Sequence, residues 1–428
     1  MDYNEFKSKA LLAWQTVPEE QSEMYKHHYL AMADEISKIA QDPVTQEEKD
    51  DPNPIVEQLE SQSDVKMDTI ISNNSFSTKS KFVKLLTESE MVSELAKKQY
   101  SSSDDKFIAM VHFNSSKNIL IDVPAGENAS INILFACPNK PFSGQIIIRV
   151  GEGATLNLLE FTTLQKESEK QTFMALLHEV TVEKNAKAEI NIIRNEGKNS
   201  ITLNFYKAKT NEYAHLKTNI LYNGGGKIRS RNNIICAEEM ALNEINESIA
   251  SCDPQKFDMY THLLNDAPKT ICHSETKALI MGTSNGYVKG FAKILKGAVG
   301  SRSYVEERGL ILDKGGYINL IPDMSIDENE VKATHSGASA PIDPNILFYL
   351  MSRGLDLKTS RQLVVNGFFG QILSKMEKTD AKRMSMALIH DKVAFGKFGH
   401  VPKIEMNELW VSDVVPGQSI FGGHYKYR

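Results

Sequence analysis

The segment GEGATLNL, residues 151–158, decides the fold because its pattern returns elsewhere in the chain. Each copy places a turn before an alanine and follows it with a strand of alternating apolar residues. The other copies are GENASINI (126–133), KNAKAEI (184–190) and NEYAHLKTNI (211–220), and GGYINLI (315–321) resembles a later one. The alanines of the first four, Ala129, Ala154, Ala186 and Ala214, lie 25, 32 and 28 residues apart. A loose period of this length, carried by strands and turns, is typical of the stacked coils of a β-solenoid.

A β-sandwich is the competing structure. It has hairpin turns about every 8–12 residues, and the region contains some intervals that short, so the alternative stays open. A solenoid has one further requirement. Its end coils expose unpaired strand edges, which need either a helical cap or a partner chain.

The sequence flanking the strands predicts helices at both ends. Tyr25, Met32 and Ile36 belong to an apolar stripe with helical spacing, which predicts a helix over residues 1 to about 40. The acidic, proline-containing segment 41–54 is typical of a linker. We therefore expect four regions: an N-terminal helical region with its linker (1–64), the β-solenoid core (65–342), a C-terminal helical domain (343–396) and an irregular tail (397–428).

The start of the C-terminal helical domain carries clear helix signals. Asp343 can cap a helix whose first residue is Pro344, and Gly354 can end it in a left-handed conformation. Further helices are expected over 357–376 and 379–395. We expect these helices to cover the end of the solenoid and to offer a docking surface.

Composition excludes several classes of protein. Apolar residues make up 41% of the 428, yet no run approaches the roughly 18–20 that a membrane span needs. The N-terminus is not typical of a signal peptide, so we expect a cytoplasmic protein. The net charge of −6, without a block of Lys and Arg, argues against nucleic acid as a partner. The four cysteines, Cys137, Cys236, Cys252 and Cys272, form no CxxC knuckle or disulfide framework, which favours reduced thiols.

The apparent enzyme motif of the sequence fails on inspection. The segment NGGGKIRS (223–230) has Leu221 and Ile228 where a P-loop requires glycine and Ser or Thr, so it is interpreted as a turn. An HExxH element is also missing from the sequence. We therefore expect a non-enzymatic protein, and any ATP hydrolysis would come from a partner.

Two histidine positions are candidate sites. Cys272 and His273 are adjacent, and in a strand their side chains would point to opposite faces. A buried, purely structural cysteine is the simpler interpretation of Cys272. His335 lies in KATHSGASAPIDPNILFYLMSRGL (332–355), between the last strand and the first C-terminal helix. Its imidazole can bind a metal, or it can form a hydrogen bond with a backbone carbonyl of the turn. Both interpretations remain open.

The segment containing His335, the NGFF at 366–369 and the block CHSETKALIMGTSNGYVKGFAKILKGA at 272–298 resemble the SufB/SufD family of the SUF iron–sulfur cluster assembly system. The resemblance extends over about residues 65–395. It implies a right-handed parallel β-helix between N-terminal helices and a C-terminal helical domain. It also implies a dimer, with a SufB-like paralogue or with itself, and an ABC-type ATPase resembling SufC as a partner.

The resemblance assigns roles to individual residues. His335 matches a histidine of the dimer interface implicated in cluster assembly, so it is the expected metal ligand for a transient iron–sulfur cluster shared with a partner chain. Cys272 and His273 are further candidate cofactor-binding residues. The expected ATPase-binding motif consists of Leu347, Phe348, Tyr349, Leu350, Arg353 and Gly354.

Some positions depart from the family pattern. Ser336 follows His335 where SufB-type chains have glutamate, and no cysteine follows Cys272. Ala333 occupies a position where SufD-type chains often have cysteine. These departures place the chain nearer SufD than SufB.

Two other functions compete with the assembly scaffold. A β-solenoid carbohydrate-active enzyme would need paired acids on neighbouring coils, and Asp313, Asp323 and Asp327 show no matched spacing. A purely structural solenoid with interaction helices would not need the chemistry of His335 or Cys272.

Overall fold

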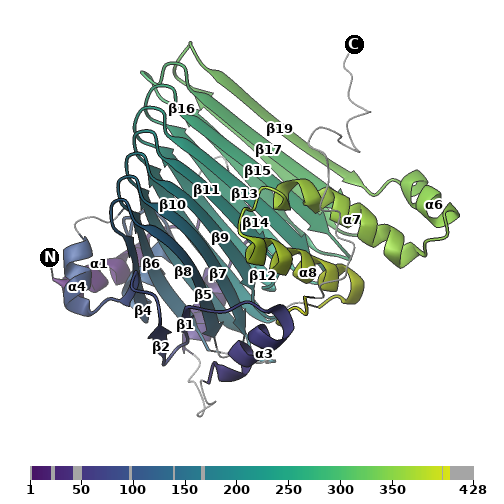
Figure 1. Cartoon of the computed structure of the whole chain (residues 1–428), viewed down its shortest axis with the longest axis horizontal. Helices are drawn as coiled ribbons and strands as arrows, with labels where there is room; N and C mark the ends of the chain where they lie inside the picture. The colour runs from purple at the N-terminus through teal and green to yellow at the C-terminus, as the bar shows by residue number, and fades with distance from the viewer. Residues whose placement is uncertain are drawn as a thin grey trace.

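The computed structural model describes residues 2–20, 25–41, 51–95, 99–137, 140–164, 169–397 and 399–404. The centre of the molecule is a parallel β-solenoid of about seven turns, with helices contributed by the N-terminal and C-terminal parts of the chain (Figure 1). Strands of successive coils pair in parallel, as a solenoid requires and hairpin-linked sheets of a sandwich do not. The solenoid prediction is confirmed.

The chain alternates between two sheets. Sheet A has the order β19-β17-β15-β13-β11-β9-β7-β5-β1-β2, and sheet B has the order β18-β16-β14-β12-β10-β8-β6-β4-β3. The strands of sheet A are β1 (Thr69–Ile71), β2 (Phe76–Thr78), β5 (Asn128–Cys137), β7 (Thr155–Leu164), β9 (Lys187–Asn195), β11 (His215–Tyr222), β13 (Leu242–Ser251), β15 (Ile271–Ile280), β17 (Arg302–Ile311) and β19 (Lys332–Pro341). Those of sheet B are β3 (Val83–Leu85), β4 (Lys117–Val123), β6 (Phe142–Val150), β8 (Thr172–Val182), β10 (Ser200–Thr210), β12 (Lys227–Cys236), β14 (Lys256–Asn265), β16 (Asn285–Ile294) and β18 (Tyr317–Ile326).

The register of the coils differs from the alanine repeat in two places. Ala129 pairs with Leu156 and is therefore not the equivalent of Ala154 in the next coil. The segment GGYINLI leads into β18 of sheet B, whereas the alanine-marked turns lead into strands of sheet A. Ala154, Ala186 and Ala214 do occupy equivalent positions, because each precedes a strand of sheet A in matching register.

A ladder of turns joins sheet B to sheet A along one side of the solenoid. Backbone bonds connect successive turns: the Gly153 N–H donates to the Lys184 carbonyl at 3.0 Å, and the Asn185 N–H to the Glu212 carbonyl at 3.0 Å. In seven coils, the residue two positions before the strand of sheet A has a positive φ. These residues are Gly126, Gly153, Asn185, Tyr213, Met240, Lys269 and Gly300. The recurring left-handed residue, rather than the alanine, marks the coil.

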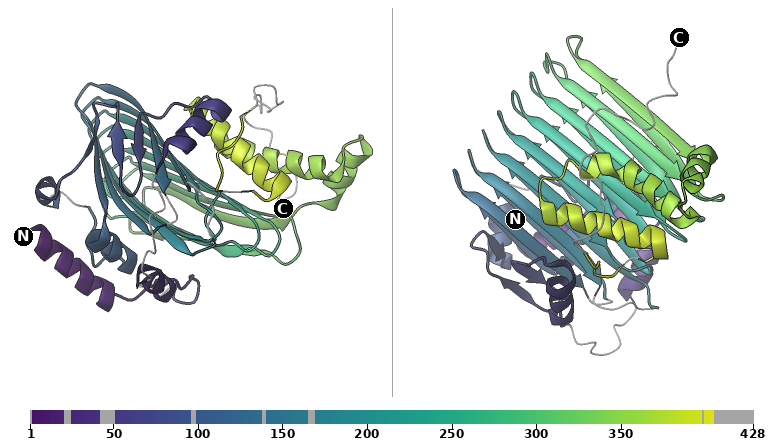
Figure 2. Two further views of the ribbon diagram at one scale, coloured as in Figure 1. Left: turned by 90° about the horizontal axis from the view of Figure 1, so that it is seen from below. Right: turned by 45° about the vertical axis from the view of Figure 1, so that its right-hand side comes forward.

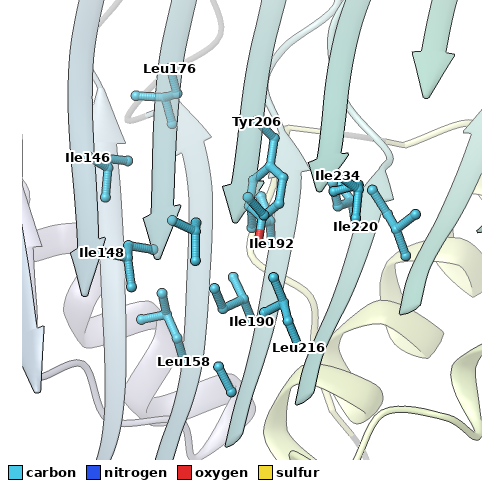
Figure 3. Close-up of a cluster of buried hydrophobic side chains, with 14 of the residues drawn as sticks. Ile146, Ile148, Leu158, Leu176, Ile190, Ile192, Tyr206, Leu216, Ile220 and Ile234 are labelled. Carbon is cyan, nitrogen blue, oxygen red and sulfur yellow. The ribbon is translucent and has the colours of Figure 1, made fainter. Parts of the chain in front are cut away.

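The main hydrophobic core lies between the two sheets. Alternate side chains of every strand point inward, because successive residues of a strand face opposite sides. Figure 3 shows this core at its middle, with Ile146, Ile148, Leu176, Tyr206 and Ile234 from sheet B facing Leu158, Ile190, Ile192, Leu216 and Ile220 from sheet A. Each such buried side chain contributes roughly 1.5–3 kcal/mol to folding.

The N-terminal helices cover the outer face of sheet B. They are α1 (Tyr3–Thr16), α2 (Ala33–Gln41), α4 (Glu88–Leu95) and α5 (Lys106–Asn114). In Figure 2, left, they lie on the opposite side of the sheets from α3 (Asn53–Ser63). Ile36 of α2 packs with Phe107 of α5 and Phe205 of β10 in one buried cluster.

Two C-terminal helices, α7 (Leu357–Leu373) and α8 (Thr379–Phe395), lie on the outer face of sheet A together with α3 (Figure 2, right). The third, α6 (Pro344–Ser352), packs against α7 and not against the sheet. The expected position of the C-terminal helices over the solenoid end is wrong, because α7 packs across β13 and β15. The reason is that sheet A turns apolar residues such as Ile193, Leu221 and Leu279 outward, and these bury the apolar side chains of α7 and α8.

The N-terminal prediction also needs correction. The expected helix over residues 1 to about 40 is two helices, because the described residues 25–32 between them are turns and extended chain. Tyr25 of this stretch is 3% exposed and packs on Tyr260, with ring centroids 5.2 Å apart. Its apolar residues therefore bind the solenoid directly. The predicted linker lies mostly outside the described residues, as does most of the predicted tail.

No described helix is both long and apolar enough to cross a membrane.

Candidate functional site

His335 lies on β19, the last strand of sheet A. Its register partner is Val305 of β17, whose side chain belongs to the main core. His335 is nevertheless exposed, because within the described parts of the chain no further strand pairs with β19. The imidazole therefore lies at the open end of the solenoid, on the row of residues that faces the interior in earlier coils.

The rest of β19 is suited to a second chain. Small residues dominate the strand, and nearly all of it is exposed. An edge strand offers a row of backbone N–H and C=O groups that another strand can pair with. A neutral imidazole among them is a common metal ligand.

Cys272 is inside the solenoid. It is fully buried in the main core, and its Sγ lies 3.1 Å from Sγ of Cys236. Burial, and then the neighbouring thiol of Cys236, raise the pKa of Cys272 well above its ordinary value. A buried thiol with a raised pKa is poorly reactive and a poor metal ligand in this conformation.

His273 points to the outer face of β15, so the prediction that Cys272 and His273 face opposite sides is confirmed. The His273 ring meets Tyr304 edge-on, with centroids 6.1 Å apart. Burial, and then the positive charge of Lys375, lower the pKa of His273. A neutral imidazole is favoured there.

The structure does not bring the three candidate residues together. Cys272 is in register with Ser303 and then with Ala333, two residues before His335. One candidate therefore lies in the core, one on the outer face and one at the edge. In the described ranges, no three His, Cys, Asp or Glu side chains are grouped so that they could hold a metal.

The helix α6 presents the predicted ATPase-binding motif. The Asp343 side chain caps it by accepting a bond from the Asn345 N–H at 2.8 Å, and Pro344 is its first residue. Gly354 follows with a φ of +93°, as the sequence predicted for the helix end. The local signals in the sequence therefore set both ends of this helix correctly.

No residue of α6 is buried, although the helix is mostly apolar. Phe348 is 74% exposed and Tyr349 57% exposed, while Leu347 and Leu350 are half-buried. The exposed Arg353 guanidinium lies over the Tyr349 ring, 5.1 Å from its centroid. Figure 1 shows α6 projecting away from the sheets beyond α7.

Two further apolar residues extend this surface. Met351, 44% exposed, belongs to the apolar face of the helix and lies within the predicted motif, and Leu357, 49% exposed and not predicted, follows the motif. The sequence signal for this surface was an apolar helix that lacks a polar face. Such a helix must be covered by a partner if the rest of the chain does not cover it.

The fold and these two exposed elements define a class: a parallel β-solenoid in which, among the described residues, the last strand of sheet A is unpaired on one side and an apolar helix is not buried. The family model described as "SUF system FeS cluster assembly, SufBD core domain" matches residues 135–368, more than half of the chain. The chain therefore belongs to the SufBD family. This match does not separate SufB from SufD.

Individual relatives are more distant. The chain is 22% identical over 245 residues to "Protein ABCI7, chloroplastic" of Arabidopsis thaliana, which covers 56% of this chain and 50% of the relative. It is 28% identical over 199 residues to an "Iron-sulfur cluster assembly SufBD family protein" of Mycobacterium tuberculosis, covering 46% of this chain and 23% of the relative. A second such protein of that organism is 35% identical over 96 residues, covering 22% and 24%. The chain thus spans half or less of the length of these relatives.

Proposed function

We propose that this chain is a non-enzymatic scaffold subunit of an iron–sulfur cluster assembly complex, which builds clusters and transfers them with the help of an ABC-type ATPase. Membership of the SufBD family supports this role. The observation that carries it is the open edge strand β19 with the exposed His335.

The proposed dimer forms through β19. Its exposed backbone groups would pair with the corresponding strand of a SufB-like paralogue or of a second copy. The neighbouring edge of sheet B is less suited to pairing, because Pro322 of β18 lacks an N–H. Pairing would bury His335 at the interface of the two chains.

The cluster would be shared between the chains. Iron–sulfur clusters are held mainly by cysteine thiolates, and Cys272 lies inside the core with a protonated thiol favoured. His335 would therefore contribute an imidazole while the partner contributes thiolates. Of the three candidate ligands, our proposal rests on His335 and not on Cys272 or His273. Weak ligation suits a scaffold that must release its cargo.

A SufD-like role follows from the same region. Ala333 lies where SufD-type chains often have cysteine, and Ser336 lies where SufB-type chains have glutamate. The chain would thus be the partner that supplies fewer ligands.

The ATPase would bind α6. Phe348 and Tyr349 are large, exposed aromatic side chains of the kind that dominate binding energy at protein interfaces. We also propose a cytoplasmic location, which is consistent with the free thiols of Cys236, Cys252 and Cys272.

Anaerobic co-expression tests this function. The chain is expressed with an ABC-type ATPase and a SufB-like protein from the same genome, purified through a tag on this chain, and assayed for bound iron and sulfide. We expect the ATPase to co-purify and the complex to contain both elements. A complex with neither ATPase nor iron would contradict the proposal.

A further inference from the structure

Three inward-facing polar residues lie side by side in sheet A near the open end of the solenoid. Glu247 of β13 is in register with Thr276 of β15, which is in register with Glu307 of β17. Their exposures are 1%, 2% and 1%. Two buried carboxyl groups thus flank one threonine on the inner face.

Sheet B supplies three small or polar residues to the same part of the interior. Asn232, Thr261 and Gly290 are in register on β12, β14 and β16. The Asn232 amide donates to Glu247 Oε1 at 2.8 Å, and the Thr261 hydroxyl to Glu247 Oε2 at 2.5 Å. Glu247 is therefore well satisfied by neutral donors.

Glu307, in contrast, accepts no well-formed hydrogen bond from the described residues, although the backbone N–H groups of Ile321 and Gly290 lie close enough to favour its charged form. Its side chain reaches across to sheet B, where a Cβ on Gly290 would lie 2.9 Å from Oε1. The glycine leaves room for the carboxyl group at this point.

Neither carboxyl group has a cationic neighbour. No Lys, Arg or His in the described residues forms an ion pair with Glu247 or Glu307. Burial raises the pKa of Glu307 to about 8, the nearby N–H of Ile321 opposes this, and the charge of Glu247 adds to it.

We propose that Glu307 and Glu247 bind one hard divalent cation inside the solenoid, with the hydroxyl oxygens of Thr261 and Thr276 as further ligands. Oxygen ligands with two carboxylates suit cations of the Mg²⁺ and Mn²⁺ type. The cation would neutralise both carboxylates and tie sheet A to sheet B. This site is independent of the proposed function, since it does not use His335.

The site is closed in the folded chain, because its carboxyl groups are only 1% exposed. The cation must therefore enter the site while the chain folds. The test unfolds the full chain in urea and refolds it with Mn²⁺ or with EDTA, removes unbound ions, and measures the manganese retained per chain and the thermal midpoint. We expect about one Mn²⁺ per chain and a higher midpoint in the Mn²⁺ sample.

Matched variants locate the ion. Glu307→Gln and Glu247→Gln keep side-chain size, and each should lower retained Mn²⁺ at least about tenfold. Glu306→Gln changes the neighbouring, outward-facing residue and should retain the ion, as should His335→Ala, which separates this site from the cluster site. The proposal is overturned if the wild-type chain refolds without retaining Mn²⁺, or if both glutamine variants, folded by circular dichroism, retain as much as wild type.

Discussion

Cys272 and His273 are neighbours in the chain, yet one is sealed in the core and the other lies on the outer face of β15. His335, on the inward row of β19, is exposed only because the solenoid ends there. The chemistry available to a polar residue therefore depends on whether its side chain points to the inner or the outer face of the strand, and on which coil of the solenoid contains it. The alternation of a strand predicts the face from sequence. The coil to which a residue belongs depends on the pairing of strands about 30 residues apart, such as β13 with β15 and β15 with β17, which places Glu247 and Glu307 in one row.

His262 gives the pH dependence of stability a specific source. Burial, and then the charge of Lys293, lower the pKa of His262 to about 4, against 6.5 in the unfolded chain. Between these values the unfolded chain binds more protons, so stability present above pH 6.5 is lost as the pH falls towards 4. Urea unfolding between pH 7 and pH 4 should show this loss, up to roughly 3 kcal/mol from this residue.

His262→Gln should flatten that part of the pH profile. His27→Gln, which changes an exposed histidine, provides the control and should follow the wild-type profile. An unchanged profile for His262→Gln would show that other groups cause the acid sensitivity.

At the scale of elements, the repeat is visible in the sequence but its register is not. The strand after each turn is signalled by alternating apolar residues. The residue that marks the turn is the one in left-handed conformation, and it is Gly153 in one coil but Tyr213 and Met240 in others. Bulky residues rarely adopt this conformation, so a pattern search based on glycine or alanine loses the register. The helix α6, in contrast, begins and ends where its capping residues predict, and α8 spans the predicted residues 379–395.

The helix α6 can be tested without disturbing the fold. Replacing both Phe348 and Tyr349 by serine should leave the thermal midpoint nearly unchanged, because neither side chain is buried. Binding of the ABC-type ATPase should weaken at least about tenfold, since exposed aromatic anchors of this type dominate interfaces. Isothermal titration calorimetry with the purified ATPase measures this effect.

Leu12→Ser on α1 is the matched control, because Leu12 is 59% exposed on a helix that covers sheet B. It should bind the ATPase like the wild-type chain. Equal affinity for the α6 variant and this control would remove α6 as the docking helix.

At the scale of the whole molecule, the solenoid and both groups of helices could be predicted, but the placement of the C-terminal helices could not. Helix signals are local, whereas the surface that a helix covers depends on residues from many coils. Leu221, Leu279 and Leu310 face outward from three strands and form one apolar surface only after the coils stack. As a result, α7 and α8 pack on the side of sheet A, and no strand among the described residues covers β19 at the end of the solenoid. In the proposed dimer, a second chain would pair with this strand.

The most direct test compares the iron and sulfide content of two anaerobically purified complexes, one with His335→Ala and one with Ser336→Ala in this chain. Both residues lie on β19, and the proposed pairing of this strand uses backbone groups that neither substitution removes, so both complexes should assemble with the same subunit ratio by native mass spectrometry. Our account predicts that the Ser336→Ala complex retains its iron and sulfide, while the His335→Ala complex loses most of both. Equal iron and sulfide in the two intact complexes would contradict it.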